Sequence, residues 1–171
     1  LDEGRKSALL IGQLTHELLQ YLPDIPKERR QAHGEKILER RDSALDIDKQ
    51  TEILCSVLEL LENPEARELF GENSLAEVDV IATLAPGKVV RGRIDRLAQV
   101  ENEIWIADFK TDRTLDASAK KHLHQIALYR AAVQSLYPGK IIRCFLIWLS
   151  QGKIDEIISD LLDEEIKQIL Q

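Results

Sequence analysis

The spacing of the apolar residues first changes near residue 73, and this change constrains the fold more than any other feature. Before it, apolar side chains recur every three or four residues, as at Ile11, Leu14 and Leu18. After it, they alternate with polar side chains, as in residues 76–83. A helical period followed by a period of two predicts helices first and strands afterwards.

The expected elements follow from this change and from the positions of proline and glycine. Helical segments are predicted over residues 4–22, 27–42, 53–61 and, as a short turn, 64–71. Strands are predicted over 76–83, 88–100 and 103–110, followed by a helix over 118–136, a strand over 140–149 and a helix from 159. The segment 103–110 is more apolar than the two strands before it and is therefore expected to be more central in the sheet. This order predicts an α/β architecture, with a mixed central sheet flanked by helices and a helical N-terminal part.

Composition narrows the class of protein. With 171 residues and 44% hydrophobic residues, the chain can bury one core without disulfides, and a single domain over 1–171 is predicted. Its two cysteines, Cys55 and Cys144, are expected to be reduced and buried. No apolar run reaches the roughly 20 residues that a membrane span requires, so no membrane partner is expected. The first residue is Leu1 and the chain has no methionine, which favours a fragment of a longer protein.

The net charge of −7 argues against a polyanionic partner, but the charge is unevenly distributed. Residues 88–121 carry eight basic residues against six acidic ones. The basic residues are Lys88, Arg91, Arg93, Arg96, Lys110, Arg113, Lys120 and Lys121. A basic strip along a nucleic acid and a solvated surface of mixed sign both agree with this pattern.

Three residues on two predicted strands have the chemistry of a phosphodiester hydrolase. Asp108 and Lys110 share one face of their strand, while Phe109 points to the opposite face, away from any metal. If the strands pair around residue 102, Asp95 approaches Asp108. Two carboxylates can hold Mg²⁺ and leave room for water and phosphate oxygen, and Lys110 can orient or deprotonate the attacking water. An Asp-x-Lys pair alone is equally an ordinary strand-end salt bridge.

An ordered set of short motifs accompanies these residues. The sequence resembles the RecB-like branch of the PD-(D/E)XK nuclease superfamily, on the side of the AddA-type helicase-nucleases. The resemblance rests on residues 12–19 (GQLTHELL), 76–78 (AEV), 92–97 (GRIDRL), 108–111 (DFKT), Gln125 with Tyr129, and 146–148 (LIW). It implies a restriction-endonuclease-like core over residues 73–171, after a mainly helical part over 1–72.

The resemblance also implies roles for individual residues. His16, Asp95, Asp108 and the main-chain carbonyl of Phe109 are implied to be metal ligands, and Lys110 the catalytic lysine. Beside them, DNA-binding or supporting roles are implied for Gln125, Tyr129, Arg93 and Arg96. The same role is implied for Glu77, with Asp79 as the alternative at this place on the strand. The remaining histidines, His33, His122 and His124, match no motif and are expected to be solvated.

The implied function is a Mg²⁺-dependent DNA exonuclease, with Mn²⁺ as a possible substitute, that resects double-strand breaks for recombinational repair. Its implied partners are a single strand of unwound DNA and an AddB-like protein, in the bacterial cytoplasm at the nucleoid. Two cysteines cannot ligate an iron-sulfur cluster, and no phosphate-binding loop is present, so ATP would act in a separate helicase part. Two alternatives stay open: a catalytically inactive nuclease-fold scaffold or DNA-binding module, and a stand-alone restriction or CRISPR-associated nuclease.

Overall fold

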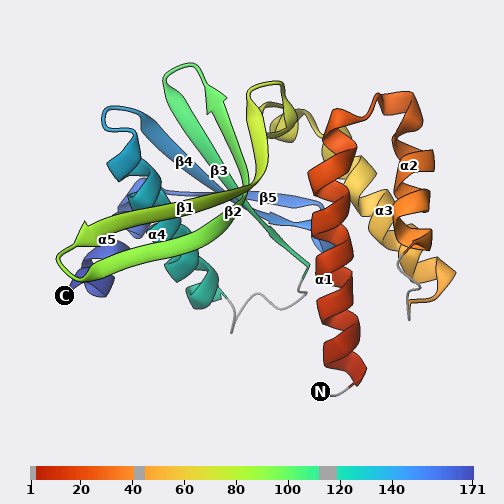
Figure 1. Cartoon of the computed structure of the whole chain (residues 1–171), viewed down its shortest axis with the longest axis horizontal. Coiled ribbons are helices and arrows are strands. Elements are labelled where there is room, and N and C mark those ends of the chain that lie inside the picture. Colours follow the sequence, from red (N-terminus) through yellow and green to blue (C-terminus); the bar gives the residue numbers. More distant parts are fainter. Residues whose placement is uncertain (1–2, 41–44, 112–118) are drawn as a thin grey trace.

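A five-stranded sheet lies between two groups of helices in the computed structural model, which describes residues 3–40, 45–111 and 119–171 (Figure 1). The N-terminal helices are α1 (Glu3–Tyr21), α2 (Lys27–Glu39) and α3 (Ile47–Glu62), with 3-10 turns η1 (Leu22–Asp24) and η2 (Pro64–Phe70). The helix α3 begins before the predicted residue 53 because the Asp46 side chain accepts the Lys49 N–H at 2.8 Å and caps it. Residues 41, 42 and 118, predicted to be helical, lie outside the described residues.

The strands lie in the order of the sequence, β1-β2-β3-β4-β5. Their bounds are β1 (Ser74–Ala85), β2 (Lys88–Val100), β3 (Glu103–Lys110), β4 (Ile141–Trp148) and β5 (Lys153–Ile157). Neighbours are antiparallel except β3 and β4, which are parallel and joined through α4 (Ala119–Leu136); the helix α5 (Ser159–Leu170) follows β5. The predicted mixed α/β sheet with β3 at its centre is confirmed. The strand β5 was not predicted, because its five residues are too few to show a period of two.

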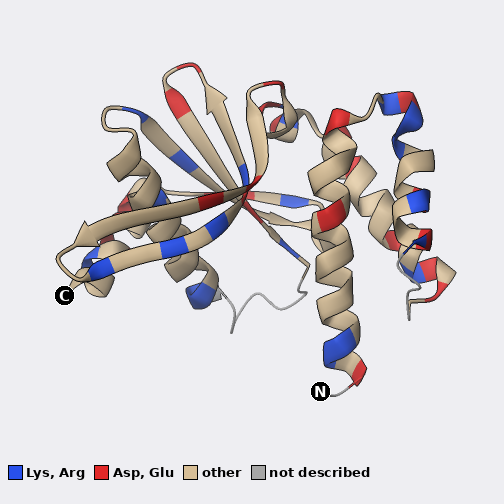
Figure 2. Ribbon diagram, viewed as in Figure 1, with Lys and Arg blue, Asp and Glu red and all other residues tan. Residues whose placement is uncertain are grey.

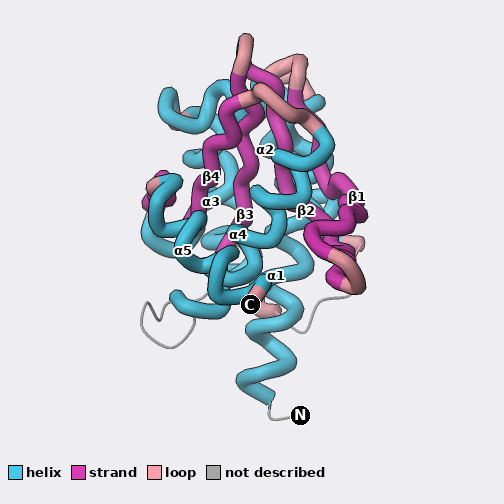
Figure 3. The backbone as a smooth tube through the Cα atoms, turned by 90° about the vertical axis from the view of Figure 1, so that its left-hand side faces the viewer, coloured by secondary structure: helices cyan, strands magenta, loops and turns pink. Residues whose placement is uncertain are grey.

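Each face of the sheet packs against its own group of helices (Figure 1), and Figure 3 shows the molecule from the side of α4 and α5. On β3, Ala107 and Phe109 pack with α1, α3 and η2, on what we call the α1 face. Ile104 and Ile106 pack with α4 on the opposite side, the α4 face. The interior strands are therefore apolar on both sides, which leaves the strand ends as the place where polar side chains from both faces can meet.

Three expectations about single residues are tested by the burial of their side chains, and two of them are wrong. Cys144 is buried on β4, as expected, but Cys55 is exposed, because α3 buries the side that carries Ile53, Leu54 and Val57. His122 is 7% exposed rather than solvated, with its ring edge-on to Trp148 at 5.8 Å between centroids.

No helix of the described residues is long and apolar enough to cross a membrane.

Candidate active site

Three acidic residues fall in one row across three neighbouring strands. In the register of β1 and β2, Glu77 falls opposite Asp95. Asp95 is also one step beyond the last pair of β2 and β3, which places it opposite Asp108. Like charges directly opposite each other destabilise a sheet, so a row of three carboxylates is a natural site for a cation.

The backbone is irregular at this row. Glu77 has a φ of 52°, and the pair of Glu77 and Asp95 is missing from the ladder between β1 and β2. On β2 the alternation also changes, since Ile94 and Leu97, three residues apart, both pack on the α4 face. A residue with positive φ costs free energy, and such strain is concentrated at functional sites. The irregularity brings Glu77 to the row, whereas Asp79 is 72% exposed and pairs with Arg93 at 2.8 Å.

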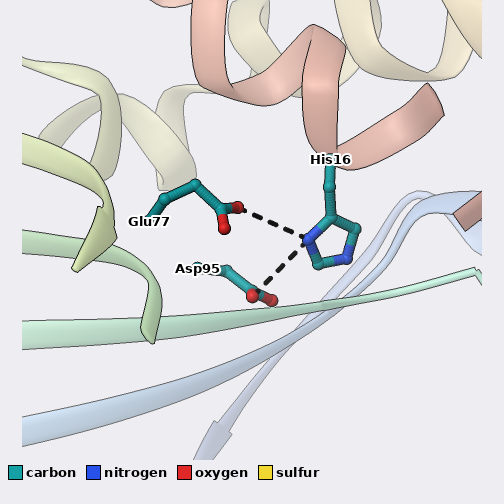
Figure 4. A group of neighbouring side chains, drawn as sticks. All are labelled: His16, Glu77 and Asp95. Carbon is teal, nitrogen blue, oxygen red and sulfur yellow. Dashed lines mark ion pairs between the residues drawn. The ribbon is translucent and has the colours of Figure 1, made fainter. Parts of the chain in front are cut away.

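His16 reaches the row from α1 (Figure 4). Its Nδ1 lies 3.5 Å from Asp95 Oδ1 and 3.7 Å from Glu77 Oε1. One ligand atom from each of these three residues lies within 4.8 Å of the others, which is the spacing of a metal-binding group. The structure thus brings together His16 and Asp95, which the sequence analysis grouped as metal ligands, and adds Glu77, which it treated only as one of two alternatives.

The ring of Phe109 lies on the same side as His16. It stands edge-on to the imidazole at 5.9 Å and stacks on Phe70 at 6.1 Å. Phe109 does point away from the face of Asp108 and Lys110, as alternation predicts, but this direction takes it toward His16. Its ring therefore contacts His16, one of the residues that the resemblance implies to be a metal ligand.

Asp95 is the electrostatic centre of the site. Its Oδ2 accepts the Phe109 N–H at 2.7 Å, and its side chain is 13% exposed. Burial, and then the Asp108 carboxylate, raise the pKa of Asp95 to about 7, while His16, the Phe109 N–H and Lys110 act in the opposite direction. A divalent cation would relieve both causes of this shift, because it compensates the lost solvation and the carboxylate repulsion.

Asp108 and Lys110 form a buried pair on the α4 face. Their side chains are 6% and 11% exposed, and the Lys110 ammonium forms an ion pair with Asp108 Oδ2. The ammonium also donates to Gln125 Oε1 on α4, at 3.5 Å. Asp108 lies outside the group of three ligand atoms, since its Oδ2 is directed to Lys110, but its charge acts on Asp95.

The predicted pair on α4 lies beside Lys110. Gln125 Nε2 donates to the hydroxyl of Tyr129 at 3.0 Å, and Tyr129 is 7% exposed. Gly92 of β2 lies against this ring, since a Cβ there would be 2.5 Å from Tyr129 Cε1. Sequence reasoning assigned no role to Gly92; its signal was a glycine inside a strand, which often marks a close approach.

The two arginines of the β2 motif have different surroundings. Arg96 is 2% exposed and donates to the Leu69 carbonyl at 2.8 Å and to Ser74 Oγ at 2.7 Å. Its guanidinium lies over Phe70 at 5.2 Å, and burial lowers its pKa. Its side chain therefore presents almost no surface to a DNA strand, and its hydrogen bonds join η2 to β1. Arg93 has a side chain that is 59% exposed, on the hairpin of β1 and β2 that also carries Lys88 and Arg91 (Figure 2).

A groove of about 600 Å³ runs along α1 and reaches the edge of the site. His16 and Glu77 belong to its lining, whereas Asp95, Asp108 and Lys110 do not. The other lining residues of α1 are Ala8, Leu9, Gly12, Gln13, Gln20, Tyr21 and the acidic Glu17. The groove therefore opens to solvent at His16 and Glu77.

Comparisons with known proteins agree with this geometry. An ATP-dependent helicase/nuclease chain of Streptococcus pneumoniae is 28% identical over 157 residues, covering 86% of this chain. The exonuclease/helicase protein RexA of the same species is 27% identical over 157 residues, and an ATP-dependent helicase/nuclease chain of Streptococcus pyogenes is 26% identical over 159 residues. The chain spans 13% of the length of these relatives.

The family comparison extends over nearly the whole chain. The model of the PD-(D/E)XK nuclease superfamily matches residues 1–168, from α1, which carries His16, to α5. This match includes every residue of the acidic row and of the α4 pair. The chain belongs to the PD-(D/E)XK nuclease superfamily.

Proposed function

We propose that the chain is the nuclease domain of a helicase-nuclease and hydrolyses phosphodiester bonds of a single DNA strand with Mg²⁺ as its cofactor. The observation that carries this proposal is the acidic row: carboxylates of three strands and His16 converge beside a buried lysine. The raised pKa of Asp95 agrees with a site that requires a cation.

The donor set fits a divalent metal. His16, Glu77 and Asp95 would hold it, with Asp108 and the main-chain carbonyl of Phe109 as further ligands. Carboxylate oxygens are the ligands that Mg²⁺ and Mn²⁺ share, so Mn²⁺ should substitute. When bound, the metal would lower the pKa of a water molecule and polarise the phosphate.

The protein's own contribution is the placement of Lys110. Its ammonium is held between the Asp108 carboxylate and the Gln125 oxygen, close to the row of ligands. An ammonium there can orient a water molecule and balance the charge that develops on the phosphate. Because Lys110 is 11% exposed and already oriented, little reorganisation is needed when substrate enters.

The groove along α1 suits a single strand. Its neutral amides and the half-exposed Tyr21 can contact bases, whereas Glu17 and Glu77 would repel phosphates that are not at the metal. Arg93 on the neighbouring hairpin offers a cation for the backbone. Base contacts along α1 and phosphate contacts at the row therefore form the proposed DNA path.

The wider role is proposed by analogy with the helicase/nuclease relatives. We propose that the chain acts beside an ATP-driven helicase part and an AddB-like protein, in the bacterial cytoplasm at the nucleoid. Resection of double-strand breaks for recombinational repair is the corresponding cellular process. The two cysteines, Cys55 and Cys144, lie on α3 and β4 and would hold no iron-sulfur cluster.

The test is cleavage of a labelled single-stranded DNA in Mg²⁺ and in Mn²⁺. Asp108→Ala and Lys110→Ala should each slow cleavage on the order of 10³-fold without unfolding the chain. Lys153→Ala is the matched control, since Lys153 pairs with Asp155 two residues away on β5, outside the site. Cleavage at the unsubstituted rate in either site variant contradicts the mechanism. DNA binding without any cleavage by the unsubstituted protein would identify the inactive scaffold instead.

A further inference from the structure

The ring of Tyr129 occupies the space that a side chain at position 92 would need. A Cβ on Gly92 would lie 2.5 Å from Tyr129 Cε1 and 2.8 Å from its hydroxyl oxygen, closer than real Cβ contacts. Tyr129 is 7% exposed, so its ring cannot move aside without disturbing its neighbours. A glycine weakens the interior of a strand, and the close approach of Tyr129 is a specific reason for one at this position.

The side-chain amide of Gln125 connects the hydroxyl of Tyr129 to the ammonium of Lys110. Gln125 Nε2 donates to the Tyr129 hydroxyl at 3.0 Å, and Lys110 Nζ donates to Gln125 Oε1 at 3.5 Å. An ammonium only donates hydrogen bonds, so the amide must present its oxygen to Lys110. Its NH₂ group then faces Tyr129, whose oxygen accepts. Lys110 therefore fixes the orientation of the amide, and the Tyr129 oxygen anchors the NH₂ end of the amide in that orientation.

We infer that Gly92 is a positioning residue for Lys110. Its missing side chain seats Tyr129, Tyr129 orients the amide of Gln125, and Gln125 holds the ammonium in place. The inference rests on the proposed function of the site, because it gives Lys110 a catalytic task. This chain of contacts joins three elements: β2 and β3 each supply one member, and α4 supplies two.

A packing role alone predicts different behaviour. If Gly92 and Tyr129 only stabilised the fold, their substitution would lower thermal stability and would lower metal binding and turnover together. A positioning role predicts that the binding of Mg²⁺ is retained, because the group of His16, Glu77 and Asp95 shares no residue with this chain of contacts. Only the turnover number, kcat, should then fall.

The experiment compares Tyr129→Phe, Gly92→Ala and the control Gly71→Ala in the 171-residue chain. A Cβ at Gly71 would lie 3.7 Å from its nearest atoms, which is ordinary contact, so this variant should cleave DNA at the unsubstituted rate. Tyr129→Phe should lower kcat about tenfold and Gly92→Ala about 10- to 100-fold. The KM for DNA and the affinity for Mg²⁺ should stay within about twofold in both.

The double variant gives a sharper result. Gly92→Ala and Tyr129→Phe disturb the same contact, so their combined effect on kcat should be no larger than that of Gly92→Ala alone. Multiplication of the two effects would overturn the inference, as would an unchanged kcat in Tyr129→Phe. A fall in Mg²⁺ affinity equal to the fall in kcat would overturn it too. If Gly92→Ala does not fold, Tyr129→Phe with Gln125→Ala provides the same cycle.

A readout without catalysis separates this inference from the proposed function. The side-chain NH₂ protons of Gln125 should be shifted and slow to exchange in the NMR spectrum of the unsubstituted protein. In Tyr129→Phe they should move toward the values of solvent-exposed amides. Unchanged amide signals in Tyr129→Phe would refute the positioning role, even in a protein that cleaves DNA. A change of these signals in a protein that cleaves no DNA would refute only the proposed function.

Discussion

The two helical layers contribute opposite kinds of chemistry to the same row of strands. From the α1 face comes His16, which meets Asp95 and Glu77 in a group that is 13–32% exposed. From the α4 face come Gln125 and Tyr129, neutral hydrogen-bonding groups beside the buried Lys110. The α1 half thus contains potential metal ligands open to solvent, whereas the α4 half is a closed network around one ammonium.

This difference indicates a division of labour. Ligands that bind and release a cation must be reached by water, and their repulsion is relieved only when the cation is present. A lysine that orients a reacting group must keep one position, which a hydrogen-bonded and buried network provides. If the division is real, substitutions in the α1 half should change metal affinity, and substitutions of Gln125 or Tyr129 in the α4 half should change turnover alone.

Asp95→Asn should have the largest effect, since Asp95 contacts both halves. Cleavage should fall on the order of 10³-fold because a central ligand is lost. Metal-free stability should rise by about 1–2 kcal/mol, because the amide removes a buried charge beside Asp108 and can still accept the Phe109 N–H. Cleavage assays and thermal unfolding without metal measure the two effects.

The control for this variant is Asp155→Asn on β5. Asp155 falls in the same row of the sheet, through Leu146 of β4, but it pairs with Lys153 and accepts from Trp148. Asp155→Asn should leave the rate of DNA cleavage unchanged. An equal stability gain in Asp155→Asn would show that the gain is not specific to Asp95. No gain in Asp95→Asn would show that the carboxylates of the row do not destabilise the metal-free fold.

His16→Ala should have the next largest effect on cleavage, and this effect should arise from metal binding alone. Loss of the imidazole is expected to weaken Mg²⁺ or Mn²⁺ binding about 10- to 100-fold, and higher metal concentration should restore cleavage. Titration calorimetry with each metal measures the affinity. His124→Ala is the matched control, because His124 pairs with Glu165 at 3.0 Å, away from the row. A loss of turnover in His16→Ala that no metal concentration restores would end the proposed division between the two halves.

The pH dependence of metal binding should follow Asp95. Its pKa is raised to about 7, so below that pH a metal must displace a proton, and affinity should fall up to about tenfold per pH unit. Above pH 7 the affinity should be flat. For the metal-free fold the sign is the reverse: the folded protein binds this proton more tightly than the unfolded chain, so stability is lost as pH rises from the ordinary carboxyl pKa of 3.8 through 7.

The measurements are metal titrations and thermal unfolding between pH of about 5 and about 9, with Asp95→Asn as the reference. The difference in metal affinity and in stability between the unsubstituted protein and this variant at each pH isolates the contribution of the Asp95 carboxyl group. An affinity that is independent of pH below 7 would contradict the raised pKa. It would also remove the electrostatic reason for placing a cation in the α1 half.

Much of this fold could be predicted from the sequence because the periodic signals are long. The strands β2 and β3 begin and end at the predicted residues, 88–100 and 103–110. Their hairpin fixes the register, and the register alone brings Asp95 opposite Asp108. The strand β5 escaped prediction because the sequence KIDEI, which follows the 3-10 turn η3 (Leu149–Gln151), is too short for a periodic signal.

The site was predictable only where the strands are regular. Alternation gave Glu77 and Asp79 the same direction, but the positive φ of Glu77 separates them, and no composition rule predicts that angle. Alternation also placed Phe109 correctly on β3, yet the sequence could not show that α1 brings His16 to the same side. Contacts between distant segments, such as Gly92 with Tyr129, require the packed structure.

Arg93 and Arg96 offer the smallest and most selective test, because the sequence treats them alike and the structure does not. Arg96 joins η2 to β1 through its hydrogen bonds to the Leu69 carbonyl and Ser74. Its guanidinium lies over Phe70, which stacks on the Phe109 ring, and that ring contacts His16. Arg96→Met should therefore lower the free energy of unfolding by about 2 kcal/mol, since it leaves the Leu69 carbonyl without its donor. It should weaken metal binding only slightly.

Arg93→Met should leave the unfolding midpoint unchanged, because the Arg93 side chain is exposed and its ion pair with Asp79 is at the surface. Its expected effect is a loss of DNA affinity of a few fold that shrinks as salt increases, since one phosphate contact is removed. Urea unfolding and DNA titrations at two salt concentrations separate the two variants. An unchanged unfolding midpoint in Arg96→Met as well would mean that Arg96 supports nothing in the α1 half, and the contrast between the halves would then depend on the metal ligands alone.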